Sequence, residues 1–108
     1  MVFHTEISFP EKLPSIGAVV AQLSLNTGLN IAYYKNRQCL ISETLDAFID
    51  FYQGELNEYC IHIFDVEDIK LIYLVNATVH ALLQLGGQSE FELSKLAGLD
   101  WKLAKLVM

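Results

Sequence analysis

A long run without charged side chains limits the folds open to this chain. No Asp, Glu, Lys or Arg lies between Lys70 and Glu90, and Leu, Ile, Val and Ala dominate the run. Strands rarely exceed about 4–8 residues, so the run predicts a single helix over residues 68–85. Gly86 and Gly87 follow it and supply the left-handed residue with which helices often end.

Acidic side chains mark the start of this predicted helix. Asp65 stands three residues before Asp68, in an N-cap-like arrangement. Together with Glu67, these residues put negative charge where a helix N-terminus carries positive partial charge. Both signals place the start of the helix at this end of the charge-free run.

The polar side chains inside the run share one face of the predicted helix, because they recur at spacings of three, four and four. The rest of the circumference is apolar, which predicts burial on more than one side. A membrane span needs about 20 predominantly apolar residues. Polar side chains interrupt this run, so we expect a buried helix of a globular protein. The residues of this polar seam are Tyr73, Asn76, His80 and Gln84.

Alternating apolar and polar residues predict a series of strands. Residues 43–53 are ambiguous, since their apolar side chains fit a helical face and a strand face. Aromatic and β-branched residues are enriched there, which favours a strand. The other strands are predicted at residues 2–9, 29–34, 38–42 and 59–65.

Two further helices are predicted. The first has Ser15 as its N-cap and closes at Gly28. The second begins at a capping box from Ser89 to Glu92, near the end of the chain. Its apolar side consists of Leu93, Leu96, Leu99, Leu103 and Leu106.

The resulting element order is β-α-β-β-(β)-β-α-α, in one domain over residues 1–108. We expect an α+β fold: a two-layer sandwich of a mostly antiparallel, four- or five-stranded sheet with the helices on one face. The first helix and the central helix should lie side by side.

Composition restricts the partners and the compartment. The net charge of −6 disfavours binding to nucleic acid or to an anionic membrane surface. Cys39 and Cys60 do not make a disulfide framework, and the N-terminus lacks a signal-peptide pattern, so a cytoplasmic protein is expected. The mean hydropathy of +0.33 and the almost charge-free helix predict a homo-oligomer, most simply a dimer.

Acidic residues are concentrated between positions 43 and 68, where no Lys or Arg occurs. Three of them precede the central helix and have a structural reason there. The others should be exposed, since burying an unpaired carboxylate costs several kcal/mol. They form a candidate surface for a basic protein partner, although solubility would also explain them. These residues are Glu43, Asp46, Asp50, Glu55 and Glu58.

No strong catalytic or ligand-binding motif occurs. There is no phosphate-binding glycine loop, no Gly-x-Ser-x-Gly and no Cys-x-x-Cys. Cys39, Cys60 and His62 would suit a soft metal if their strands aligned, but they lack tandem ligand spacing. We therefore expect no metal and no cofactor.

Two functional hypotheses follow. The first is a non-enzymatic protein–protein interaction module, which self-associates or holds a basic partner. An immunity-type or antitoxin-type protein fits the size and acidity, by analogy only. The alternative is a small-molecule-binding or enzymatic module with a pocket around His80, in which that histidine would act in acid–base chemistry. Against it stands a structural explanation of the polar seam, as the edge of a buried helix or a contact between subunits.

Overall fold

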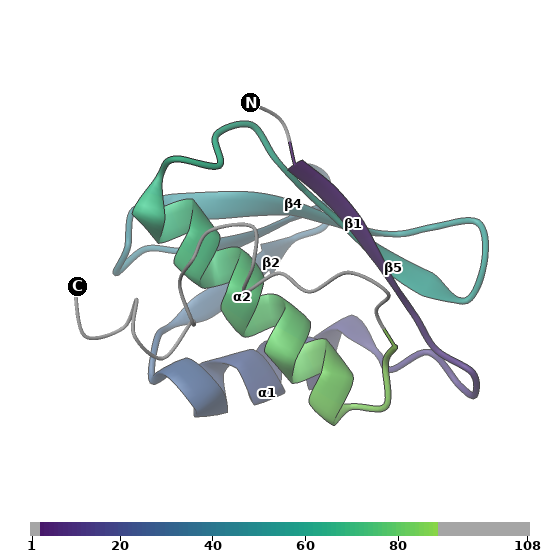
Figure 1. Cartoon of the computed structure of the whole chain (residues 1–108). Helices are drawn as coiled ribbons and strands as arrows, with labels where there is room; N and C mark the ends of the chain where they lie inside the picture. Colours follow the sequence, from purple (N-terminus) through teal and green to yellow (C-terminus); the bar gives the residue numbers. More distant parts are fainter. Residues whose placement is uncertain (1–2, 89–108) are drawn as a thin grey trace.

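The chain folds into one antiparallel sheet and two helices that cover one of its faces (Figure 1). The structure, a computed structural model, describes residues 3–88. The elements are β1 (Phe3–Ser8), α1 (Ile16–Thr27), β2 (Ile31–Tyr34), β3 (Cys39–Ser42), β4 (Ala47–Gln53), β5 (Glu58–Ile63) and α2 (Ile69–Gln84).

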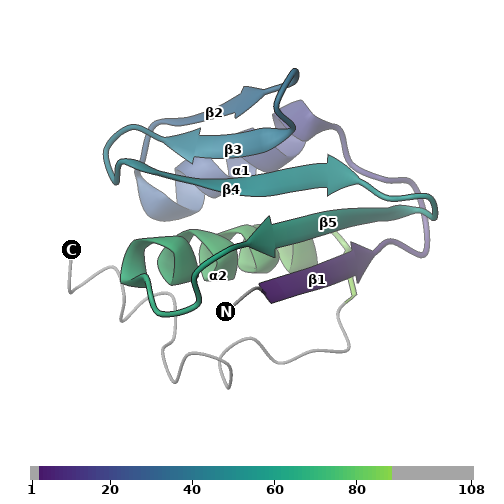
Figure 2. The same cartoon turned by 90° about the horizontal axis from the view of Figure 1, so that it is seen from above.

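The predicted α+β sandwich is confirmed. The sheet has five strands in the order β1-β5-β4-β3-β2, with antiparallel neighbours throughout. The strands β2 to β5 form a meander, and β1 is added at its far edge, beside β5. Figures 1 and 2 show α1 and α2 on the same side of the sheet. The ambiguous residues 43–53 contain β4, as the strand alternative predicted. The predicted C-terminal helix lies outside the described residues.

The helix ends follow the local sequence signals. Ser15 caps α1 by accepting a hydrogen bond from the Ala18 amide, and Gly28 closes it with φ of 73°. At α2 the predicted arrangement needs a correction, because the N-cap is Asp68, whose carboxylate accepts from the Lys70 amide. Asp65 instead accepts from the Glu67 amide, in the turn before the helix.

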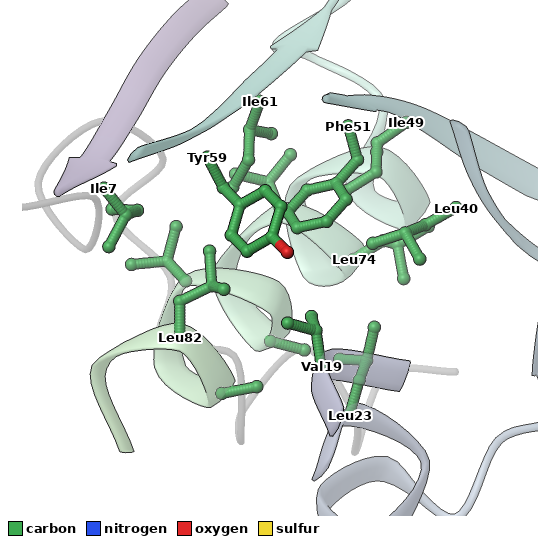
Figure 3. Packing of buried hydrophobic residues seen from close by; sticks show 14 of the residues in the cluster. Ile7, Val19, Leu23, Leu40, Ile49, Phe51, Tyr59, Ile61, Leu74 and Leu82 are labelled. Atoms are coloured by element: carbon green, nitrogen blue, oxygen red, sulfur yellow. The ribbon is translucent and has the colours of Figure 1, made fainter. Parts of the chain in front are cut away.

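The core lies between α1, α2 and the inner face of the sheet. Phe51 and Tyr59 stack across β4 and β5 with ring centroids 4.7 Å apart. Leu74 and Leu82 of α2 approach these rings from the helical layer (Figure 3). Each such side chain contributes about 1.5–3 kcal/mol when fully buried. The Tyr59 hydroxyl donates to the Pro14 carbonyl at 2.5 Å, so this buried tyrosine keeps a partner for its polar atom.

The central helix is buried around most of its circumference, as predicted. Leu74 and Leu82 face the sheet, and Tyr73 and Ile72 on its other sides are buried too. Within residues 3–88, no helix has both the length and the apolar character that a bilayer crossing would require.

The end of α2 returns to the first strand. Gly86 adopts φ of 102°, and Gln88 then exchanges two backbone hydrogen bonds with Ser8 at the outer edge of β1. Gly87 makes this approach possible, since a Cβ there would lie 2.6 Å from a methyl carbon of Ile7.

A buried charge in α2 should destabilise the whole fold. Leu74 and Val79 are 1% and 6% exposed. We expect Leu74→Asp and Val79→Asp each to lower the free energy of unfolding by about 3–5 kcal/mol, because neither site offers the carboxylate a cation. Chemical denaturation measures the change.

Leu83→Asp is the matched control. It lies in the same helix but is 43% exposed, and it should cost about 1 kcal/mol or less. Equal stability losses at positions 74 and 83 would contradict the described packing of α2.

Candidate functional site

The face of the sheet opposite the helices is open, and it carries the polar and aromatic side chains that the core does not use. Side chains alternate between the two faces along each strand. The neighbours of the core residues therefore point outward, and the strand pairing aligns them in rows. This open face comprises His4, Glu6, Ser8, Ala32, Tyr34, Cys39, Ile41, Phe48, Asp50, Tyr52, Glu58, Cys60, His62 and, just beyond β5, Phe64.

Two large apolar rings on the open face are exposed to solvent. Phe48 is 53% exposed and Phe64 is 63% exposed. Isolated exposed apolar residues are common, but these two rings line one hollow together.

This hollow is the candidate site, and we call it the acidic hollow. It has a volume of about 210 Å³. Three carboxylates and two aromatic rings converge there from four segments of the chain. Its lining comprises Asp46, Ala47, Phe48, Asp50, His62, Ile63, Phe64, Asp68 and Leu71.

Local structure positions each carboxylate of the acidic hollow. Asp46 ends the β3–β4 turn with φ of 53°, a left-handed conformation that Asp tolerates better than most residues. Asp68 is held at the start of α2 by its capping bond. Asp50 projects from the middle of β4 and lies 3.1 Å from Nδ1 of His62, its cross-strand partner.

The rings of the hollow are held by their neighbours as well. His62 meets the edge of Phe64 at a centroid distance of 4.9 Å and an interplanar angle of 78°. Asp50 orients this imidazole from the other side. The hollow therefore presents aromatic side chains beside an acidic rim.

The chemistry of the acidic hollow suits a cationic side chain. Carboxylates attract the charged head of Lys or Arg, and aromatic faces accept both its alkyl stem and its cation. Pockets for drug-sized molecules usually enclose about 300–1,000 Å³, so 210 Å³ has room for one side chain rather than for such a ligand. A second hollow, of about 480 Å³, is lined only by residues 33–37 around the β2–β3 turn and brings together no distant groups.

The Asp50–His62 pair resembles part of a catalytic triad, but the Cys60 thiol on the same strand as His62 does not complete one. Cys60 lies two residues before His62 on the same face of β5. Burial and the carboxylates of Glu58 and Glu6 raise the pKa of its thiol to about 11. A nucleophilic cysteine needs a lowered pKa, because the thiolate is the reactive form. The raised pKa therefore disfavours Cys60 as a nucleophile.

The structure disperses the five acidic residues predicted to form a partner surface. Asp46 and Asp50 line the acidic hollow, and Glu43 lies in the turn beside it. Glu55 lies in the β4–β5 turn, at the opposite end of β4. The expected exposure is wrong for Glu58, which is only 9% exposed and lies against Gly54 and Cys60.

The polar seam of α2 is mostly occupied by packing. Tyr73 and Asn76 are 1% and 8% exposed, His80 is half-buried and Gln84 is exposed. The side-chain amide oxygen of Gln84, Oε1, accepts a hydrogen bond from Nδ2 of Asn26 in α1 at 2.6 Å. At this end, the seam is part of the contact between the two helices.

The soft-metal set considered from the sequence is not brought together. All three residues, Cys39, Cys60 and His62, point to the open face. However, Cys39 pairs with Asp50, which in turn pairs with His62. Cys39 thus stands two strands away from His62 and Cys60, about 9–10 Å across the sheet.

Sequence reasoning missed the aromatic part of the site. Phe48 and Phe64 occupy positions that alternation assigns to the solvent side of β4 and β5. Large apolar residues on the polar face of two neighbouring strands were the signal that could have revealed it.

Comparison with protein-family models, with curated proteins and with solved structures found no match to this chain. The function must therefore be argued from the site itself.

The cysteine chemistry can be tested by alkylation. Burial, more than any nearby charge, raises the pKa of both thiols. We therefore expect Cys39 and Cys60 to react with iodoacetamide at pH 8 at least tenfold more slowly than a small free thiol. Mass spectrometry of the two cysteine peptides measures each rate.

The same protein in urea provides the control, because both thiols should then react at the ordinary rate. Fast labelling of Cys60 in the folded protein would indicate a lowered pKa and would revive the nucleophile interpretation.

Proposed function

We propose that this protein is a non-enzymatic protein-binding module that captures a basic side chain of a protein partner in the acidic hollow. The observation that carries the proposal is the convergence of Asp46, Asp50 and Asp68 with two exposed phenylalanines. No strand residue of the open face in the described chain is Lys or Arg, and the one basic partner of these carboxylates there is His62, which lies 3.1 Å from Asp50.

The charge of the site favours a protein partner over other classes. Nucleic acids and anionic membrane surfaces would be repelled by the carboxylates and by the net charge of −6. Arg and Lys are enriched beside aromatic residues in cation–π contacts, and Arg is common among the residues that dominate interface energies. A partner segment with Arg or Lys beside apolar residues would match both the rim and the rings.

An immunity-type or antitoxin-type role would be one such use of an acidic binding face, by analogy alone. Two buried free cysteines suit a reducing compartment, so we place the interaction in the cytoplasm. The alternative pocket around His80 has no comparable support, because its seam contributes to the contact with α1.

Partner capture tests the acidic hollow directly. The double variant Asp46→Asn and Asp50→Asn removes two charges with little change of shape. The protein and the variant are each used as bait in lysates of the cells that encode this chain. We expect the variant to lose one specific basic partner that the unchanged protein retains. Raising the salt concentration should weaken the same interaction, since exposed charges are screened beyond about 8–10 Å. Quantitative mass spectrometry of the captured proteins measures the loss.

Matched variants control for charge and for apolar surface. Glu11→Gln with Glu55→Gln removes the same charge from exposed positions outside the hollow. Phe48→Ala with Phe64→Ala should abolish capture, whereas Leu25→Ala with Leu56→Ala, which are 79% and 74% exposed, should not. If all variants capture the same proteins, the acidic residues serve solubility and the proposal fails.

Self-association remains a second prediction for the same protein. Sedimentation at micromolar concentration should show a species of twice the 12.2 kDa chain mass. If the open face forms the dimer contact, Phe48→Ala with Phe64→Ala should shift the protein to the monomer mass, because those rings are its largest exposed apolar groups. A monomer in the unchanged protein would refute the prediction of a dimer.

A further inference from the structure

A second cluster of polar groups lies on the open face, on the paired strands β1 and β5. The antiparallel register places Glu6 directly opposite Cys60, and His4 directly opposite His62. His4 and Glu6 stand two residues apart on β1, so their side chains point the same way. Three different ligand types therefore meet on two neighbouring strands.

The distances within this cluster are short. Nε2 of His4 lies 3.3 Å from Oε1 of Glu6. One ligand atom each from His4, Glu6 and Cys60 lies within 4.8 Å of the others. Around a tetrahedral zinc ion, with bonds of about 2.0–2.3 Å, neighbouring ligand atoms stand about 3.3–3.8 Å apart. Closing the difference of about 1 Å needs only side-chain rotations, because the His4 and Glu6 side chains are 43% and 55% exposed.

The surroundings of the cluster favour a cation. The Sγ atom of Cys60 has the Glu58 carboxylate 4.0 Å away, in addition to Glu6. No Lys or Arg occurs on β1 or β5, so no fixed positive charge of these strands balances the two carboxylates. A bound divalent ion would supply that balance and would give the buried thiol a strong partner as thiolate.

We propose that His4, Glu6 and Cys60 bind one zinc-like divalent transition-metal ion, with water completing its coordination. One sulfur, one imidazole nitrogen and one carboxylate oxygen suit zinc and its neighbours in the first transition series, whereas Mg²⁺ and Ca²⁺ prefer all-oxygen sites. The sequence predicted no metal site. The three residues proposed here share only Cys60 with the set Cys39, Cys60 and His62 that was considered from the sequence and set aside. The proposed site has no residue in common with the lining of the acidic hollow, although the rings of His4 and of His62, which lines the hollow, have centroids 6.3 Å apart.

Cobalt titration tests this site. Co²⁺ occupies zinc sites, and bonding to a thiolate gives it a charge-transfer absorption band in the near ultraviolet. The untagged full chain should bind one equivalent of Co²⁺ and show this band, and Cys60→Ser should lack it. Zn²⁺ should displace the cobalt and raise the melting temperature of the unchanged protein, because the ion binds only the folded arrangement of these strands.

Cys39→Ser is the matched control, since Cys39 is also a buried free cysteine of the open face but lies outside the cluster. It should keep the band. If Cys60→Ser does not fold, as judged by circular dichroism, His4→Gln decides the question, because that exposed side chain is not part of the core. It should lower the affinity for Zn²⁺ at least tenfold. Absence of saturable binding, a band that survives in Cys60→Ser, or unchanged affinity in His4→Gln would overturn the proposal.

Discussion

The fold depends on the burial of α2 against the inner face of the sheet. Leu74 and Leu82 fill the space over the Phe51–Tyr59 stack, and α1 closes the layer at their side. With both helices on this face, the hydrophobic effect is satisfied from one side only. In the described chain no helix covers the other face, so this face can carry polar and charged side chains without disturbing the core.

Because successive side chains of a strand point to opposite faces, every second strand residue lies on the open face, where the candidate sites are. Alternate residues of each strand point toward α1 and α2. The remaining residues lie on the open face, beside partners that the strand pairing determines. His62 thus acquires Asp50 as its partner on β4 and His4 on β1. Groups distant in sequence become neighbours because the sheet orders them. This holds for the proposed metal ligands and for the strand residues of the acidic hollow, to which a turn adds Asp46 and the start of α2 adds Asp68.

The sequence predicted the parts of the structure that follow from local patterns. The charge-free run, the Ser15 cap and the alternation in β5 each report on a few adjacent residues, and the corresponding elements were predicted correctly. Strand order and register depend on pairings between distant segments, which no local pattern encodes. For that reason the five acidic residues were treated as one surface although they are spread over the β3–β4 turn, β4, the β4–β5 turn and β5, and the pairing of Glu6 with Cys60 was not predicted.

The position of β1 has a consequence for how the chain assembles. The strands β2 to β5 are joined by short turns and can pair as successive hairpins, whereas β1 must find β5 with α1 and three strands intervening in the chain. Such a pairing carries the largest loop-closure entropy in the sheet. We expect β1 to be the last strand of this sheet to pair and the first to detach. It would also be the element most easily exchanged between two copies of the protein, since its pairing with β5, the Ser8–Gln88 bridge and the burial of Phe3 and Ile7 could all form again with the second copy.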